Sequence, residues 1–281
     1  MARTSQKRVS PINRTQPEAR RRSQTFKAAL ALTAGALLSM LQAPAMATND
    51  LRPYQAKYDT SALGMNLTLK RELKTDGEGG YTLTNGGKIL VVGFHEVSVF
   101  SIQDGQITPK SYVYQGTGLI NRRREVHFSP GADTVRSLYK GEWHELPNEP
   151  GTLDRMSQLE YMRLLLLNKP EHRDDLTIRV ADGRRIKDYT LNFVGEETLE
   201  TALGSVHTLH FERQHDDPER KSDFWVAPAW DYLLVKTVHI EDDKPVEVVL
   251  TGGSIDGISL KSLSSAASEA PSETEAAEQE E

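Results

Sequence analysis

The sequence predicts a mainly β protein: an antiparallel meander that forms a barrel or half-barrel, with one main α-helix packed against it. Three observations predict this fold. Hydrophobic and polar residues alternate through most of the chain with the period of two that marks a strand. Turn sequences such as Asp104-Gly105 and Asp182-Gly183 separate these runs at intervals of roughly ten residues. One segment, between Gly151 and Pro170, has helical spacing instead.

The first 47 residues have the features of a secretory signal peptide. A basic region from Arg3 to Lys27 is followed by fourteen small or apolar residues from Ala28 to Leu41. Ala45-Met46-Ala47 then supplies a small-x-small cleavage pattern. The apolar run is shorter than the roughly 20 residues of a transmembrane helix. We therefore expect cleavage after Ala47, export to the periplasm, and no transmembrane span in the mature chain.

The composition excludes several classes of function. The 281 residues include no cysteine, which rules out disulfides, thiolate metal sites and cysteine nucleophiles. The formal net charge is −6, and it becomes −13 without residues 1–47, which hold eight basic residues and one acidic residue. Nucleic acids and anionic membrane surfaces are polyanions, so this charge disfavours both as electrostatic partners. We expect no nucleic-acid partner.

A single β-rich domain is expected over residues 48–261. Two runs show the alternation most clearly: Leu63, Met65, Leu67 and Leu69 in the first, and Lys187, Tyr189, Leu191 and Phe193 in the second. Each run presents one apolar face and one polar face, as half-buried antiparallel strands do. Further turn sequences include Asn85-Gly86-Gly87 and Gly252-Gly253. The spacing predicts about eleven or twelve strands.

The helical segment covers residues 152–169. Its apolar side carries Leu153, Met156, Leu159 and Leu167. Thr152 is placed to cap the helix start, Asp154 suits the first turn, and Pro170 marks the stop. The last turn, Leu164 to Leu167, is apolar all round, so it must be buried on several sides. We expect the helix to plug or lid the concave side of the sheet; packing on one outer face is the alternative.

Residues 262–281 form a different kind of segment. They include six glutamates, no basic residue and few apolar ones. Such a segment buries too little surface to offset the entropy of ordering. We expect a disordered acidic tail, which serves either as a tether or as an unselected terminus.

Several short motifs follow one another along the chain. They are Tyr54-x-x-x-Tyr58, Gly105 with Pro109-x-x-Tyr112, an arginine-bearing strand ending in Phe128, Asp154-x-x-Ser157, Gly195 to Leu199 with Thr201-x-x-Gly204, and Trp225-Val226-Ala227-Pro228. In this order, between Leu51 and Leu250, they resemble the bacterial envelope family called domain of unknown function 3108. This chain has Leu233-Leu234-Val235 where that family is expected to have Leu-Pro-Val. The resemblance implies a secreted, mostly β domain, similar in shape to the half-barrels of lipoprotein carriers and outer-membrane acceptor proteins.

Local spacing assembles no catalytic or metal site. The chain has no G-x-S-x-G nucleophile elbow, no G-x-x-x-x-G-K-[ST] phosphate loop and no H-E-x-x-H zinc helix. Ser137 and Lys140 are three residues apart in an expected strand, so they point to opposite faces and cannot act as a Ser-x-x-Lys pair. The same spacing separates His207 from His210 as metal ligands. We therefore expect no catalytic residue, no metal or other cofactor, and no enzymatic activity.

The main candidate for ligand binding is the arginine-rich strand from Asn121 to Phe128. Alternation places Arg122 and Arg124 on the apolar face, together with Val126. Unpaired guanidinium groups on a core face are costly, so they need acidic partners, a wet cavity or an anionic ligand. One interpretation is exposure at the strand end or pairing with acids such as Glu96. The other is a basic rim that grips a phosphate or carboxylate head at the mouth of an apolar groove.

Four aromatic residues are further candidates for ligand contact. Tyr112 and Tyr114 share one strand face, and Trp225 and Trp230 flank a Val-Ala-Pro-Ala segment. Such rings stack on sugars or line acyl grooves, and they also serve as core and collar residues of a barrel. Both interpretations stay open at this point.

Three functions remain. The first is a non-enzymatic binding or carrier module for a hydrophobic or lipid-like envelope ligand: a lipid, an acyl chain or a lipoprotein. The second is a cell-envelope module that contacts a protein or a glycan and has no internal ligand cavity. The third is a hydrolase whose site is assembled by residues distant in sequence. The first predicts an apolar cavity with Arg122 or Arg124 at its mouth, and the second predicts an exposed aromatic or apolar patch.

Overall fold

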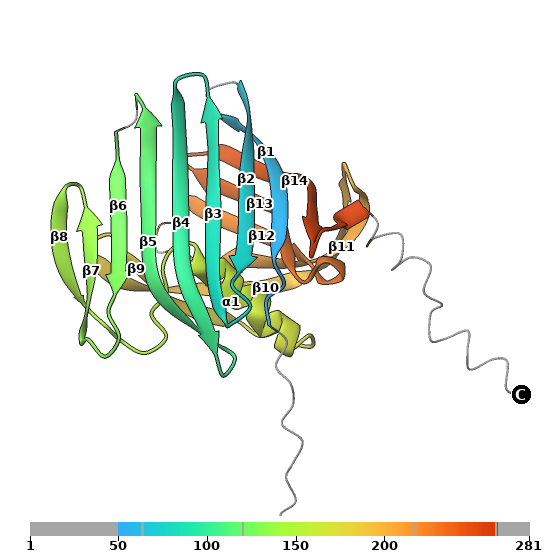
Figure 1. Cartoon of the computed structure of the whole chain (residues 1–281). Coiled ribbons are helices and arrows are strands. Elements are labelled where there is room, and N and C mark those ends of the chain that lie inside the picture. The colour runs from blue at the N-terminus through green and yellow to red at the C-terminus, as the bar shows by residue number, and fades with distance from the viewer. Residues whose placement is uncertain are drawn as a thin grey trace, which may run out of the picture. The chain divides into compact units, whose positions relative to one another are not determined.

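The computed structural model describes residues 50–62, 65–119, 121–215, 217, 219–261 and 263. In them the strands form an antiparallel meander that curls into a nearly closed barrel around one α-helix (Figure 1). This confirms the predicted fold class. The predictions for residues 1–47 and for nearly all of 262–281 fall outside the described residues. No helix in the described part of the chain is long and apolar enough to cross a membrane.

Eight strands form the first wall of the barrel, and each is hydrogen-bonded to the next. They are β1 (Tyr54–Ala62), β2 (Met65–Thr75), β3 (Gly80–Ile89), β4 (Val92–Gln103), β5 (Gln106–Gly118), β6 (Arg123–Phe128), β7 (Thr134–Tyr139) and β8 (Glu142–Pro147). The second wall consists of β9 (Leu176–Asp182), β10 (Arg185–Thr201), β11 (Gly204–Arg213), β12 (Arg220–Ala227), β13 (Leu233–Glu241) and β14 (Lys244–Ile255). A 3-10 turn, η1 (Pro228–Trp230), follows β12, and the short β15 (Ile258–Ser259) pairs with β14. Pairing of β14 with β1 joins the two walls into one sheet.

The main path of the described sheet has fourteen strands, more than the eleven or twelve expected. Two expected turns are also wrong, since Asn85-Gly86-Gly87 lies inside β3 and Gly252-Gly253 lies inside β14. A Cβ atom at Gly86 would come within 2.8 Å of the Phe94 carbonyl oxygen. Gly86 therefore allows the neighbouring strand β4 to approach closely. Glycine in a strand can mark such a close approach as well as a turn. The chain reverses instead at Leu90-Val91.

The predicted alternation is confirmed where the structure describes it. In β2, Leu67 and Leu69 are half-buried, whereas Asn66, Thr68 and Lys70 are exposed. In β10, Tyr189 and Leu191 are buried in the core, whereas Asp188 is exposed and pairs with Arg179 of β9. Leu63, the first residue of the predicted β2 run, lies outside the described residues.

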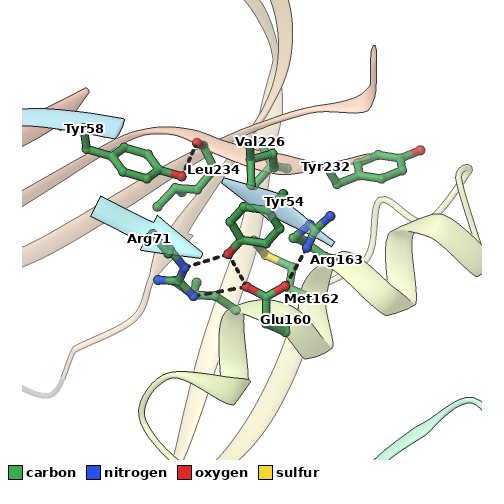
Figure 2. A pocket seen from close by; sticks show the side chains of 11 residues that line it. Tyr54, Tyr58, Arg71, Glu160, Met162, Arg163, Val226, Tyr232 and Leu234 are labelled. Atoms are coloured by element: carbon green, nitrogen blue, oxygen red, sulfur yellow. Dashed lines mark hydrogen bonds and ion pairs between the residues drawn. The ribbon is translucent and has the colours of Figure 1, made fainter. Parts of the chain in front are cut away.

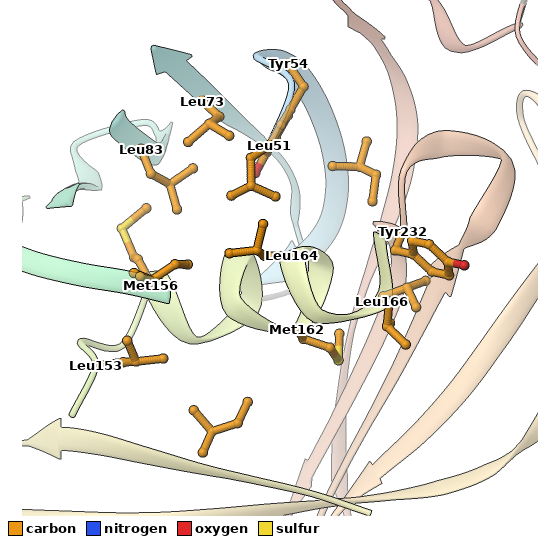
Figure 3. Close-up of a cluster of buried hydrophobic side chains, with 14 of the residues drawn as sticks. Leu51, Tyr54, Leu73, Leu83, Leu153, Met156, Met162, Leu164, Leu166 and Tyr232 are labelled. Atoms are coloured by element: carbon orange, nitrogen blue, oxygen red, sulfur yellow. The ribbon is translucent and has the colours of Figure 1, made fainter. Parts of the chain in front are cut away.

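The helix α1 (Ser157–Asn168) lies inside the barrel, between the two walls (Figures 1 and 3). Leu164 faces Leu73 and Leu83 of the first wall, whereas Met162 and Leu166 point toward the opposite side. All five side chains are at most 2% exposed. The prediction that the helix plugs the concave side of the sheet is therefore confirmed. The alternative of packing on an outer face is wrong.

The start of α1 differs from the prediction. The helix begins at Ser157, and the Thr152 hydroxyl donates to a turn carbonyl instead of capping it. The Asp154 carboxylate accepts the backbone N–H groups of Met156 and Ser157 at 2.8 and 3.0 Å. Asp154 therefore satisfies donors that a helix start leaves unpaired. The predicted end is confirmed, because α1 stops at Asn168, before Pro170.

The barrel comes closest to closing between β8 and β9, which are the two edges of the sheet path. Leu153 forms a parallel bridge with Val180 of β9. Ser137 of β7 donates its hydroxyl hydrogen to the Gly183 carbonyl, at 2.6 Å. These contacts hold the segment before α1, and β7 beside the edge strand of the first wall, against the second wall.

Candidate ligand-binding site

An inward-facing apolar strip crosses the first wall. Tyr58, a core residue, pairs in register with Leu69, Leu69 with Gly87, and Gly87 with Phe94. Residues paired across neighbouring strands share a face, so Tyr58, Leu69 and Phe94 all point inward, and Gly87 lies between Leu69 and Phe94 without a side chain. The Phe94 ring stacks on Tyr114, with 6.0 Å between the ring centroids. Leu69, Phe94 and Tyr114 are only half-buried, so this inner strip keeps apolar surface accessible.

The inner strip leads into a polar pocket, because Tyr114 pairs in register with Arg124 of β6. We call it the arginine pocket; its volume is about 240 Å³, and it is lined by Glu96, Tyr112, Tyr114, Arg122, Arg124 and Arg155. The Arg124 guanidinium lies 5.3 Å from the centroid of the Tyr139 ring, a cation–π distance. The pocket therefore joins a cationic lining to an apolar surface.

Four of the six residues proposed from the sequence meet in this pocket. Arg124 is half-buried and shares the inward face of β6 with Val126, as predicted. The placement of Arg122 on a core face was wrong, because β6 begins at Arg123 and Arg122 is exposed just before it. Among the described residues, neither Arg122 nor Arg124 forms an ion pair with a carboxylate. Both charges therefore remain available to an anion.

Glu96 is the carboxylate in the arginine pocket, and neutral groups bind it. Tyr112 donates its hydroxyl hydrogen to Glu96 at 2.7 Å, and the Asn85 amide donates to the other carboxylate oxygen at 3.0 Å. Burial, together with the negative charge of Glu96, raises the pKa of Tyr112. Tyr112 therefore stays protonated and keeps donating to Glu96. This arrangement holds Glu96 at one side of the pocket.

A second pocket adjoins the arginine pocket and shares Arg124 and Arg155 with it. Its volume is about 640 Å³, and it is lined by Arg124, Tyr139, Arg155, Asp182, Gly183, Arg184, Arg185 and Lys187. Arg155 and Lys187 bind the Asp182 carboxylate at 3.4 and 3.2 Å. Burial opposes ionisation of Asp182, but Arg155 and its other partners hold the pKa of Asp182 below its usual value. Together the two pockets are lined by six basic and two acidic side chains, in a chain that is acidic as a whole.

Trp225 and Trp230, the two tryptophans proposed to contact a ligand, lie outside both pockets. Trp230 is completely buried in the core, next to β12. Trp225 lies on the outer face of β12, where its ring stacks on His210 at 4.3 Å and its indole N–H donates to Glu197. Neither lines the arginine pocket. Trp230 is therefore a core residue, whereas Trp225 is half-buried on the outside of the barrel.

Sequence reasoning missed Arg155, Arg184, Arg185 and Lys187 as site residues. Arg155 lies in the segment with helical spacing, and nothing local in the sequence connects it with the arginine-bearing strand. It reaches the pocket because α1 begins two residues later, which leaves Arg155 in the bend before the helix. Strand alternation puts Lys187 on the same face as Tyr189 and Leu191, shortly after the Asp182-Gly183 turn. Arg184 and Arg185 directly follow this turn, so the turn and Lys187 together could have indicated a basic site here.

A second polar cluster lies in the barrel interior, where it anchors α1 to the walls (Figure 2). Glu160 of α1 accepts hydrogen bonds from the Tyr54 hydroxyl at 2.7 Å, from Arg71 of β2 at 3.2 Å and from Arg163 at 2.6 Å. Arg163 also donates to the Asp231 carbonyl at 3.1 Å. Glu160 is 1% exposed and Arg163 is 2% exposed. Charges this deep need such partners to be tolerated.

The space beside this interior cluster is small. The pocket lined by Tyr54, Arg71, Glu160 and Arg163 has a volume of about 10 Å³, which suits roughly one water molecule. One guanidinium nitrogen of Arg163, Nη2, has no hydrogen-bond partner among the described residues. The interior cluster therefore holds the helix in place, whereas the arginine pocket has the room for a ligand group.

The chain is similar to a known protein family and to a solved structure. A family model described as "Protein of unknown function (DUF3108)" matches residues 80–251. The chain belongs to the DUF3108 family. The match contains all six residues that line the arginine pocket, so this pocket lies in the DUF3108 part of the chain. The Tyr54-x-x-x-Tyr58 motif lies before the matched region.

This DUF3108 protein is also similar to a solved structure, "Crystal Structure of Beta-barrel-like Protein of Domain of Unknown Function DUF1849 from Brucella abortus". The two share 12% sequence identity with a TM-score of 0.49, over 74% of this chain and 99% of the other. None of the curated proteins matches the chain.

Proposed function

We propose that this DUF3108 protein is a non-enzymatic periplasmic binding or carrier module for an amphipathic envelope ligand. The anionic head of the ligand, a phosphate or a carboxylate, binds in the arginine pocket. Its apolar part lies along the inner strip. The observation that carries the proposal is a pocket with three arginines and one carboxylate, next to accessible apolar side chains.

The chemistry of the pocket suits an anionic head group. Guanidinium groups bind phosphate and carboxylate oxygens through paired, charge-assisted hydrogen bonds. Arg124 is half-buried, so it has lost part of its hydration without gaining an ion pair among the described residues. A bound anion offsets that loss. The signal-peptide pattern supports export, and a lipid, an acyl chain or a lipoprotein supplies both an apolar part and an envelope location.

The prediction is that Arg122→Gln together with Arg124→Gln weakens ligand binding at least tenfold. A charge-assisted hydrogen bond contributes about 1.5–3 kcal/mol, and about 1.4 kcal/mol corresponds to a tenfold change. The measurement is native mass spectrometry of the mature chain purified from the periplasm without detergent, followed by titration with dansyl-labelled undecanoic acid. Thermal unfolding of the same samples shows whether the fold is kept.

The matched control is Arg220→Gln with Lys221→Gln, which removes the same charge from an exposed part of β12. This control should bind as the wild type does. Equal loss of binding in both double variants would contradict a specific arginine site. A wild-type chain that carries no lipid and does not bind the labelled fatty acid would overturn the carrier proposal.

A second function has its own observation in favour. Trp143 of β8 is 45% exposed, and Arg136 lies over its ring at 4.6 Å, with His127 at 5.6 Å. Such an exposed aromatic patch suits contact with an envelope protein or a glycan. Trp143→Ala separates the two functions, because it should leave binding of the labelled fatty acid unchanged.

A further inference from the structure

We infer that one rim of the barrel is a membrane-docking tip that binds an anionic lipid surface. The tip consists of Leu90, Val91 and Leu119, which are 75%, 62% and 81% exposed. These are the three most exposed large hydrophobic side chains in the part of the chain that the structure describes. This inference goes beyond the proposed carrier function and does not depend on it.

The three residues belong to one place in the fold. Leu90 and Val91 form the β3–β4 turn, and Leu119 follows β5, the next strand. The backbone N–H of Leu119 lies 3.4 Å from the Val91 carbonyl oxygen, as a hydrogen-bond donor. Val92 and Gly118 are partners in the β4–β5 register. Figure 1 shows the β3–β4 turn and the end of β5 at the same edge of the first wall.

Neither the backbone conformation nor packing in the core explains why residue 90 in this turn is a leucine. Leu90 has a φ of 50°, in the left-handed region that favours glycine and asparagine over leucine. An apolar side chain in this position accepts backbone strain and also exposes its surface to water. Turns of this kind ordinarily carry polar residues or glycine. Burial of the Leu90 side chain in a partner surface would offset both the backbone strain and the exposed apolar area.

Basic side chains flank the tip. Lys88 precedes it in β3, and Arg122 follows it just before β6; both are exposed. Arg123, the first residue of β6, is also exposed, but its guanidinium pairs with Glu125. The negative net charge of the mature chain disfavours anionic membranes in general. Charges in solution are screened beyond roughly 8–10 Å, however, so the nearby basic groups decide the attraction at a contact. Apolar residues at a tip, with lysine and arginine behind them, suit insertion into the boundary between headgroups and acyl chains.

A bilayer fits this tip better than a folded protein partner does. The apolar residues project at a chain reversal and a strand end, and their side chains are aliphatic rather than the aromatic anchors typical of protein interfaces. Arg122 lines the arginine pocket and also lies close behind the tip. Docking here would bring the pocket next to lipid headgroups.

The test is flotation of the full mature chain with vesicles of phosphatidylethanolamine and phosphatidylglycerol. The variant is Leu90→Asn with Val91→Ser and Leu119→Ser, and we expect its vesicle affinity to fall at least tenfold. Asparagine tolerates the left-handed backbone of residue 90, so the variant should fold, which thermal unfolding checks. Lys88→Gln should weaken binding to these vesicles but not to vesicles of phosphatidylcholine alone.

The control is Val194→Ser, which removes an apolar side chain that is 55% exposed on β10. It should bind vesicles as the wild type does. A second measurement uses Leu90→Trp, whose fluorescence should shift to shorter wavelength when vesicles are added. Absence of wild-type flotation, unchanged flotation of the triple variant, or an equal loss with Val194→Ser would each overturn the inference. Retention of the labelled fatty acid by the triple variant shows that the carrier site is separate from the tip.

Discussion

Replacing Glu160 with alanine should lower the free energy of unfolding by about 3–5 kcal/mol. Glu160 is 1% exposed and binds Arg71 and Arg163, which come from a wall strand and from α1 itself. Without the carboxylate, two guanidinium groups remain in the barrel interior with no carboxylate between them. Losing one partner of a buried ion pair leaves the other charge uncompensated, and this is the source of the large cost.

Urea denaturation of the wild type, Glu160→Ala and Glu160→Gln measures this effect. Glu160→Gln should cost less, because its amide oxygen still accepts one of the hydrogen bonds. Glu78→Ala makes the same change in an exposed turn and serves as the control, with an expected effect within about 0.5 kcal/mol. A loss at Glu160 no larger than that at Glu78 would show that the interior cluster does not hold α1.

The same cluster predicts a dependence on pH. Burial opposes ionisation of Glu160, but Arg163 and Arg71 hold its pKa below the usual value. A carboxyl group whose pKa is lowered by folding stabilises the protein above its unfolded pKa, about 4.3 for glutamate. That stabilisation is lost as the pH falls through the lower, folded pKa. Unfolding measured between neutral and acid pH should therefore show a smaller acid loss in Glu160→Gln than in the wild type.

Replacing Asp154 with alanine should lower the free energy of unfolding by at least about 3 kcal/mol, because several buried donors lose their acceptor and each one left unpaired costs about 1–3 kcal/mol. The Asp154 carboxylate is completely buried. It accepts hydrogen bonds from the hydroxyls of Ser98 and Ser157, at 2.7 and 2.9 Å, and from two backbone N–H groups at the start of α1. It therefore fixes the helix start to β4. Arg155, the next residue, reaches the arginine pocket from this bend.

Thermal and urea unfolding of Asp154→Ala and Asp154→Asn test this role. Asparagine keeps one oxygen acceptor for the backbone donors and should lose less stability. Asp133→Ala, in an exposed loop, is the matched control. We also expect Asp154→Ala, but not Asp133→Ala, to weaken binding of the labelled fatty acid, since it frees the segment that carries Arg155. Unchanged binding in a folded Asp154→Ala chain would show that Arg155 does not depend on this anchor.

Much of the fold follows from local patterns in the sequence. The period of two in runs such as Lys187 to Phe193 predicted strands, and the apolar last turn of α1 predicted burial on several sides. Both are confirmed. The same alternation put Tyr112 and Tyr114 on one face of their strand and Arg124 on the face of Val126, as two separate candidates. The register between β5 and β6 then brings Arg124 beside Tyr114. Turn positions follow less directly from the sequence, since the glycines of Asn85-Gly86-Gly87 allow close strand approach instead of a reversal.

What the sequence by itself determined was the β meander, one inner helix and the arginine-bearing strand, because backbone sterics and side-chain period act over a few residues. Only the tertiary structure decided the rest. Arg155 joins Arg124 across more than thirty residues of chain, Glu160 meets Arg71 across 89, and Leu119 meets the turn at Leu90-Val91. These contacts depend on how the curled sheet brings strands that are distant in sequence together. A local sequence pattern does not determine which distant residues come into contact.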